Sequence, residues 1–258
     1  MEITLKDKVS VITGGTAGIG LKIAEVFAQA GSKIAICSRK QSNLESALDH
    51  LKTEGLSAYS ETVDVSKRSE IFTFADNVEK EFGGIDIWVS NAGICPLYKL
   101  VDTPEDIWQR VMDVNVRSVY YGGLIAKDKF TKRGGGVLIN AASYTTLMPS
   151  VGMGAYSVSK AAIYSMTRIF AAELAPLNIR VFCYIPGIIE TNMTSDIIKA
   201  KKDILESQIA LHRIGDCEDV ANAVLFMASD KATYITGSYV EVSGGKFCVQ
   251  NPDAAWTP

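Results

Sequence analysis

The chain has 258 residues, of which 47% are hydrophobic and 21% are charged, and its formal net charge is −3. These values are typical of a globular protein with enough apolar residues for a sheet that is buried on both faces. The small negative charge, with no basic run longer than Lys201-Lys202, argues against nucleic acid or an anionic membrane surface as a partner.

Short apolar runs bounded by turn residues alternate with amphipathic segments along the chain, which indicates β-α-β units around a parallel sheet. Strands are expected at residues 9–13, 33–38, 57–63, 85–90, 136–140, 179–185 and 238–242. Helices are expected at residues 19–30, 43–54, 67–82, 104–129, 155–174, 195–208 and 217–228. We therefore predict an α/β fold, a single-domain Rossmann-type doubly wound sheet of about seven parallel strands with helices on both faces.

Local signals mark the start of the helix expected at residues 104–129 and the end of the expected domain. Pro104 suits the first position of its helix, and Thr103 before it suits an N-cap. Residues 246–258 follow two glycines and lack periodicity, so they are expected to form a C-terminal tail on one domain that spans residues 1–258.

Cysteine and histidine usage gives no sign of a metal site. The five cysteines are scattered and none lies in a CxxC pair, so neither a disulfide framework nor a zinc site is indicated. His50 and His212 are expected at the surface and are too few for a His-based metal site or triad.

With no apolar signal-peptide core and no run of 18 apolar residues, we expect a cytoplasmic protein that contacts no membrane.

A glycine-rich turn, Thr13-Gly14-Gly15-Thr16-Ala17-Gly18-Ile19-Gly20, joins the first expected strand to the first helix. Gly14 permits a tight turn, Gly18 allows backbone N–H groups to approach a pyrophosphate, and Gly20 allows the helix to pack close to the strand. The turn therefore predicts a dinucleotide site, with Thr16 and Ile19 as further contacts.

The end of the second expected strand bears on the choice of dinucleotide. A Rossmann fold that uses NAD places an acidic residue there, on the ribose 2′-hydroxyl. This chain has Ser38 followed by Arg39 and Lys40. Because a guanidinium pairs bidentately with phosphate oxygens, this arrangement suits a 2′-phosphate, and we predict NADP(H) as the cofactor.

Tyr156 and Lys160 are one helical turn apart and therefore share a helix face. A cation at roughly 4 Å in an effective dielectric of about 20 would lower the pKa of a tyrosine, ordinarily about 10, by up to about three units. Tyr156 would then be a workable general acid/base. The Tyr-x-x-x-Lys spacing alone is weak evidence, but with Ser143 upstream and the glycine-rich turn before it, the order indicates hydride chemistry on a carbonyl or alcohol.

In these motifs, and in Asn91-Ala92-Gly93 after the fourth strand, the chain resembles the short-chain dehydrogenase/reductase family from about residue 5 to about residue 245. The resemblance implies that Ser143 hydrogen-bonds the substrate oxygen, that Lys160 also holds the nicotinamide ribose, and that Asn115 holds a water relaying protons to Lys160. The further cofactor contacts that it implies are Asp64 and Val65 at the adenine, Asn91, Ala92 and Gly93, and a carboxamide segment with Pro186, Gly187, Ile189 and Thr191.

Two positions depart from the family pattern. Ser90 stands where the family has a first asparagine, and Ala17 stands where many NADP-using members have a second basic residue. The second departure makes the expected NADPH preference weaker than in members with two cations.

The substrate is expected to be a small-molecule carbonyl or alcohol. The lining of the substrate site looks mainly apolar, without a basic clamp for a carboxylate or phosphate. A ketone, a ketoester, a sugar or a steroid would all fit. The expected lining comes from residues 94–96, a lid over residues 188–205, and Ser143, Tyr144, Thr145, Leu147, Met148, Met153 and Tyr156.

The leading interpretation is an NADP(H)-dependent carbonyl reductase. A 3-oxoacyl-thioester reductase of fatty-acid synthesis looks similar, but no Lys/Arg patch for an acidic carrier protein is evident. A non-catalytic nucleotide-sensing protein would typically have lost the tyrosine or the lysine.

The resemblance also implies a homotetramer built on the helices at 104–129 and 155–174. The apolar Phe247, Val249 and Trp256 suggest that the tail packs on a neighbouring subunit near its substrate entrance.

Overall fold

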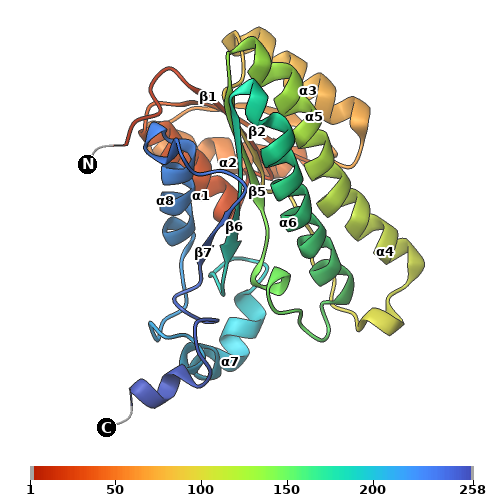
Figure 1. Cartoon of the computed structure of the whole chain (residues 1–258), viewed down its shortest axis with the longest axis vertical. Helices are drawn as coiled ribbons and strands as arrows, with labels where there is room; N and C mark the ends of the chain where they lie inside the picture. The colour runs from red at the N-terminus through yellow and green to blue at the C-terminus, as the bar shows by residue number, and fades with distance from the viewer. Residues whose placement is uncertain (1–2, 257–258) are drawn as a thin grey trace.

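The computed structural model describes residues 3–256 and contains a seven-stranded parallel sheet with the strand order β3-β2-β1-β4-β5-β6-β7 (Figure 1). The order reverses between β1 and β4, as in doubly wound folds. The strands are β1 (Val9–Thr13), β2 (Lys33–Ser38), β3 (Tyr59–Thr62), β4 (Ile87–Ser90), β5 (Gly136–Ala141), β6 (Ile179–Pro186) and β7 (Tyr239–Val242).

Helices cover both faces of the sheet (Figure 1). One face packs on α1 (Gly18–Gln29), α2 (Gln41–Thr53) and α8 (Cys217–Ala228), and the other packs on α3 (Arg68–Phe82), α5 (Ser118–Lys132) and α6 (Gly154–Leu174). Neighbouring residues of β1 point to opposite faces, so Val11 joins one hydrophobic core and Ile12 the other. This burial on both sides explains why the strands read as continuous apolar runs.

The predicted fold class is confirmed, and most element boundaries agree within a few residues. The strand predicted at 57–63 is the largest difference among the strands, because β3 pairs with β2 only over Tyr59–Thr62. The helix predicted at 195–208 is α7 (Ser195–Ser207), which lies below the carboxyl ends of the strands (Figure 1).

The helix predicted at residues 104–129 is interrupted. It begins as α4 (Glu105–Val111), passes through a π-helical turn (Met112–Arg117) and continues as α5. Pro104 is the N-cap rather than the first helical residue, and the Thr103 hydroxyl donates to the carbonyl of Lys99, so the predicted capping role of Thr103 is wrong. Such π turns are often found at functional sites.

The described part of the C-terminal tail, residues 246–256, folds back on its own chain. Phe247 stacks on Tyr144 with ring centroids 5.4 Å apart, and Trp256 stacks on His212 at 4.6 Å. The indole N–H of Trp256 also donates to the carbonyl of Ala210 at 3.1 Å. Two of the three apolar tail residues that suggested a neighbouring subunit as the partner therefore have partners within the same subunit.

Residues 3–256 contain neither a membrane-spanning helix nor a cluster of metal-ligating side chains. In that span no helix is both long enough and apolar enough to cross a membrane. The same residues contain no cluster of three or more His, Cys, Asp or Glu side chains that could hold a metal ion.

Candidate active site

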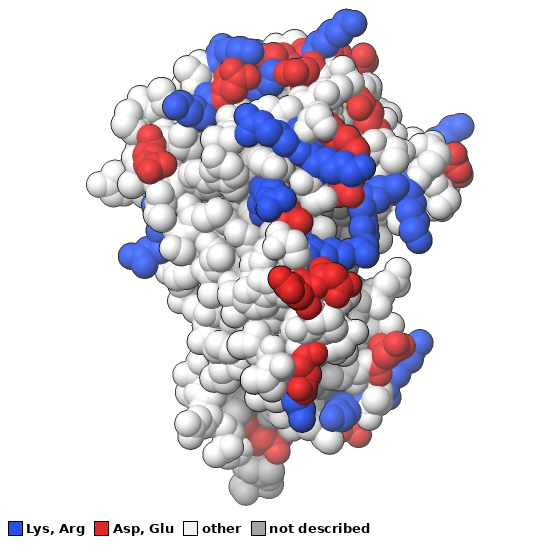
Figure 2. Space-filling view, turned by 90° about the vertical axis from the view of Figure 1, so that its right-hand side faces the viewer, with Lys and Arg blue, Asp and Glu red and all other residues white. Residues whose placement is uncertain are grey.

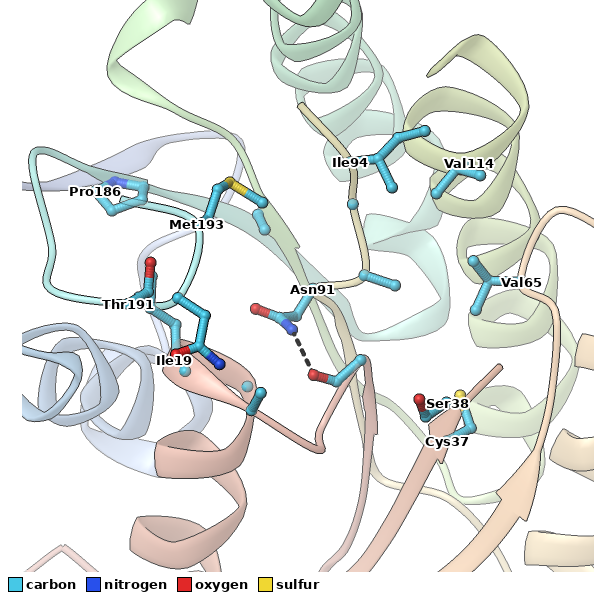
Figure 3. Close-up of a pocket in the computed structure, with 18 of the residues that line it drawn as sticks. Ile19, Cys37, Ser38, Val65, Asn91, Ile94, Val114, Pro186, Thr191 and Met193 are labelled. Carbon is cyan, nitrogen blue, oxygen red and sulfur yellow. Dashed lines mark hydrogen bonds between the residues drawn. The ribbon is translucent and has the colours of Figure 1, made fainter. Parts of the chain in front are cut away.

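A cavity of about 380 Å³ lies at the carboxyl ends of the central strands, at the point where the strand order reverses. Ligands of open α/β sheets bind in this position. In Figure 3, Pro186, Thr191 and Met193 lie on one side of the cavity, and Ile94, Val114 and Val65 lie on the other. The predicted site residues that line it are Gly14, Gly18, Ile19, Gly20, Ser38, Arg39, Val65, Asn91, Ala92, Gly93, Tyr156, Lys160, Pro186 and Thr191.

The glycine-rich turn leaves no room for side chains where it meets the loop after β4. A Cβ on Gly14 would lie 3.0 Å from Ala92 Cα, and Gly14 itself has φ +65°. A Cβ on Gly20 would lie 2.4 Å from Asn91 Nδ2. Ala17, before α1, provides no side-chain cap, and the first turn of α1 has no acidic residue. The first N–H groups of α1 therefore meet no competing side chain at the place where an anionic group would bind.

A hydrogen-bond network that the sequence analysis missed holds this turn in place. The Tyr184 hydroxyl donates to Asn91 Oδ1 at 2.8 Å, and Asn91 Nδ2 donates to the carbonyl of Thr13 at 3.0 Å. Asn91 Nδ2 also donates to the carbonyl of Gly14 at 3.2 Å (Figure 3). Thr13 Oγ1 accepts from the backbone N–H groups of Asn91 and Ala92. A tyrosine inside an apolar, buried strand needs a hydrogen-bond partner for its hydroxyl, and that need was the available signal for Tyr184.

The end of β2 presents Ser38 and Arg39 to the cavity, whereas Lys40 is exposed and outside it. Asp64 is also outside the lining, and its Oδ1 accepts from the Ser66 N–H (3.0 Å) and hydroxyl (2.7 Å). Burial acts to raise the pKa of Asp64, but the hydrogen bonds from Ser66 and the charge of Arg39 outweigh it and lower that pKa. One oxygen of this carboxylate thus caps the turn into α3, and contact with adenine stays a prediction.

The carboxamide segment is only partly at the cavity. Pro186 and Thr191 line it, but the Gly187 N–H is bonded to the carbonyl of Val242, and Ile189 is 4% exposed and packs in the hydrophobic core. Thr16 is likewise outside the lining. Asn192 and Met193, which belong to the lid predicted over residues 188–205, follow Thr191 directly and also line the cavity. The lining residues that the sequence analysis missed include Cys37, Val114 and Ala142.

Three of the predicted catalytic side chains converge at this cavity. Tyr156 and Lys160 lie near the start of α6 and line it, while Ser143, after β5, is buried and hydrogen-bonded to Tyr156. Lys160 Nζ donates to the carbonyl of Ala141 at 2.6 Å and lies 5.5 Å from the centre of the Tyr156 ring.

The surroundings shift both pKa values in the direction of the neutral forms. Tyr156 keeps some surface towards the cavity, but protein atoms surround its hydroxyl, and this burial raises its pKa although the hydrogen bond with Ser143 opposes the rise. Burial also lowers the pKa of Lys160 to about 8. The net shift of the Tyr156 pKa is therefore upwards, opposite to the expected lowering, because desolvation of the hydroxyl outweighs the hydrogen bond with Ser143. The Tyr156 hydroxyl is therefore in its protonated, neutral form at neutral pH.

The lowered pKa of Lys160 predicts a pH-dependent gain in stability for Lys160→Met. In an unfolded chain this lysine has a pKa near 10.5, so between about 8 and 10.5 the unfolded state binds more protons and the wild type becomes more stable as pH rises. Below pH 8 the buried charge costs up to about 3 kcal/mol. We expect Lys160→Met to be more stable than wild type at pH 7 by about 1 to 3 kcal/mol, allowing for the lost hydrogen bond to Ala141, and the gain to shrink by pH 10.

Denaturant unfolding of both proteins at pH 7 and pH 10 measures this difference. Lys199→Met, at an exposed position of α7, is the matched control. An equal stability difference at the two pH values would show that the charge of Lys160 is not its source.

Asn115 lies in the π-helical turn and is fully buried. Its Oδ1 accepts from the N–H of Ile94 (2.9 Å), and its Nδ2 donates to the carbonyl of Ile94 (3.0 Å) and to Ser159 Oγ (3.0 Å). A Cβ on Gly93 would lie 3.4 Å from Asn115 Oδ1 and 3.7 Å from Lys160 Nζ. Asn115 therefore joins the loop after β4 to α6 next to Lys160, and its role in holding a water stays a prediction.

The predicted substrate residues differ in accessibility. The sulfur of Met153 lies 3.8 Å from the Tyr144 hydroxyl, and Met148 is 59% exposed. Thr145 has no accessible surface, which corrects its predicted contact with the substrate. Its backbone N–H donates to Ser143 Oγ at 3.2 Å, so Thr145 acts on the site through the position of Ser143.

Comparison with known proteins agrees with this geometry. The family described as enoyl-(acyl carrier protein) reductase matches residues 14–246. The chain is 38% identical over 244 residues to dehydrogenase/reductase SDR family member 4 of Oryctolagus cuniculus, covering 93% of this chain and 94% of that protein. It is 33% identical over 246 residues to a 3alpha-hydroxysteroid dehydrogenase of Mediterraneibacter gnavus, covering 95% and 98%.

A solved structure of a 7α-hydroxysteroid dehydrogenase, complexed with NADH and 7-oxo glycochenodeoxycholic acid, superimposes with a TM-score of 0.89. That protein is 31% identical in sequence, and the match covers 95% of this chain and 96% of that one. The architecture of the chain is therefore shared with that dehydrogenase.

Proposed function

The chain belongs to the short-chain dehydrogenase/reductase family, a family of oxidoreductases, and on this basis we propose that it transfers a hydride between NADP(H) and a ketone or secondary alcohol. The observation that carries the proposal is the convergence of Ser143, Tyr156 and Lys160 at the cavity beside the glycine-rich turn. A hydrogen-bond donor, a proton donor and a buried cation would thereby be held next to the place where a dinucleotide would bind.

The residues of the cavity fit a dinucleotide. Gly14 and Gly20 have no space for a Cβ because they pack against the loop after β4 and within the turn, and Gly18, whose backbone would approach the pyrophosphate, lines the cavity. Arg39 and Ser38 would hold the 2′-phosphate, and Pro186 and Thr191 would lie near the nicotinamide. When bound, the cofactor supplies or accepts the hydride.

The protein's own part in the reaction is proton transfer and orientation. In the direction of reduction, the neutral Tyr156 hydroxyl donates its proton to the carbonyl oxygen of the substrate. The Ser143 hydroxyl, already bonded to Tyr156, hydrogen-bonds the same oxygen and favours its developing charge. Lys160 is close enough to the Tyr156 ring to stabilise the tyrosinate that remains.

Absorbance assays with NADPH and NADH against a panel of ketones and 3-oxoacyl thioesters test the proposal. The hydroxysteroid dehydrogenases among the relatives are the reason to include ketosteroids in the panel. We expect ketones to be reduced with NADPH. Reduction of acyl thioesters alone would favour the fatty-acid synthesis alternative, and no turnover with bound cofactor would favour a nucleotide-sensing protein.

We propose a homotetramer in which α5 and α6 pair with the same helices of other subunits. The face that carries α4 and α5 has charges of both signs over its upper part and a broad uncharged area beside them (Figure 2). Exposed apolar side chains on α5 and α6 include Tyr120, Val158 and Ile169, the last 52% exposed. Large exposed apolar groups on helix surfaces commonly mark interfaces.

Light scattering is expected to give the mass of four chains of 27.9 kDa. Val158→Glu with Ile169→Glu should shift that mass to smaller species, while Lys199→Glu should not. A wild type with the mass of one chain would contradict the proposal.

The five cysteines are all free thiols, which supports a reducing, cytoplasmic location.

A further inference from the structure

A second cavity, of about 780 Å³, lies between the C-terminal tail and the loop after β5, and we call it the tail groove. Its walls start from segments that also build the catalytic site, because Tyr144 follows Ser143 and Ile188 follows Pro186 and Gly187 closely in the chain. The lining residues that matter below are Tyr144, Met148, Lys246, Phe247, Val249 and Asp253.

The walls of the tail groove combine apolar and polar side chains, and the apolar ones include two aromatic rings. Tyr144 and Phe247 are stacked with their rings at 19°, so the tail extends the aromatic surface that begins beside Ser143. Met148 and Val249 are each 59% exposed. Exposed apolar side chains along a concave surface are typical of ligand sites, and an elongated apolar body would cover them.

One lining residue brings a positive charge that has no ion-pair partner. Lys246 is the only Lys or Arg of the tail groove, and it is half-buried. Its Nζ donates to Gln208 Oε1 at 2.7 Å and lies 5.8 Å from the centre of the Phe247 ring. Among the described residues no carboxylate lies within salt-bridge distance of it. An ammonium has three N–H donors, so further donors remain for a ligand.

The other charged lining residue is already paired. Asp253 lies 2.8 Å from His212 Nε2, and His212 is in turn stacked on Trp256. The tail groove therefore combines an apolar surface with one partly desolvated cation. Burial lowers the pKa of Lys246, as expected for a charge that has lost part of its hydration and that an anion would stabilise.

We propose that the tail groove holds the remote part of the substrate and that Lys246 pairs with a carboxylate on it. This rests on the proposed function, and it deepens that function by naming the substrate class as elongated, apolar oxo-carboxylic acids. It also revises the sequence-based expectation of a lining without a basic clamp, because the clamp comes from the tail. Selectivity for the anion then comes from a charge-assisted hydrogen bond, and apolar contacts supply the remaining affinity.

The test compares charged and neutral substrates on proteins that differ in the charge of residue 246. The substrates are 4-, 7- and 10-oxo fatty acids, the primary amide of each, and acetophenone as a small neutral ketone. The proteins are wild type, Lys246→Met, Lys246→Arg and, as a control on α7, Lys199→Met. The measurements are kcat/KM for each pair and the dissociation constant of each acid and amide from calorimetry.

We expect Lys246→Met to lower kcat/KM for the acid that best fits the groove by about tenfold to hundredfold, and to change that of its amide by less than about threefold. Lys246→Arg should keep the preference for the acid, and turnover of acetophenone should be unchanged in all variants. The amide measured on the same protein controls for any loss of stability.

An equal loss for acid and amide, or a wild type that does not prefer any acid over its amide, would overturn the inference. These outcomes differ from failure of the proposed function, in which no ketone, acetophenone included, is reduced. In that case calorimetry still decides whether Lys246 binds the carboxylate, because tight binding of an acid that Lys246→Met weakens supports the site without turnover.

Discussion

Replacing Tyr156 by phenylalanine is expected to lower kcat by at least about 10² to 10⁴ while NADPH binding stays nearly intact. The hydroxyl that is lost donates the proton to the reacting oxygen, and in the structure its partner is Ser143. The phenyl ring keeps the volume of the tyrosine, so the cavity wall is preserved. Single-turnover kinetics and cofactor titration by fluorescence measure the two quantities separately.

Tyr164→Phe is the matched control, because Tyr164 lies on the same helix and contacts Tyr239 away from the cavity. It should retain wild-type turnover. Lys160→Ala should differ from Tyr156→Phe and weaken both turnover and cofactor binding. If Tyr156→Phe keeps more than about a tenth of the wild-type kcat, Tyr156 is not the general acid.

The raised pKa of Tyr156 also gives this prediction a direction in pH. A buried, neutral phenol is ready to donate a proton, so carbonyl reduction should proceed at neutral pH. Alcohol oxidation needs the ionised form and should increase as pH rises. Initial rates in both directions across pH 6 to 10 test this, and oxidation that peaks at low pH would contradict the assigned proton donor.

The second large effect concerns the choice between NADPH and NADH. Arg39 lines the cavity at the end of β2, and a hydrogen bond to a charged group there is worth about a tenfold to hundredfold preference for NADPH. The double change Ser38→Asp with Arg39→Ala should reverse the preference, because the new carboxylate repels a 2′-phosphate and accepts a hydrogen bond from a 2′-hydroxyl. The kcat/KM values for both cofactors give the result.

Lys40 provides the control for this experiment. It follows Arg39 directly but is exposed and outside the cavity lining, so Lys40→Ala should change the cofactor preference by less than about threefold. A wild type that prefers NADH, or a double variant that keeps its NADPH preference, would show that the 2′-phosphate binds elsewhere. An effect of Lys40 equal to that of Arg39 would mean that long-range charge, not direct contact, sets the preference.

Local patterns in the sequence were enough for the fold and for much of the candidate site. The period of apolar residues and the turn residues predicted β1, β2 and α8 with their observed boundaries. The glycine-rich turn, Tyr156 and Lys160 were found because their function depends on short spacings along one turn or one helix. These features are encoded by residues close together in the chain, so the sequence alone determined them.

The tertiary structure decided what depends on contacts between distant segments. It turned Thr145 and Ile189 away from the cavity, joined Tyr184 to Asn91, and placed Asn115 in a π turn between Ile94 and Ser159. It also raised the pKa of Tyr156, since burial is set by every segment that packs around the hydroxyl. Desolvation and hydrogen-bond partnership are properties of three-dimensional packing, so no local pattern in the chain could report them.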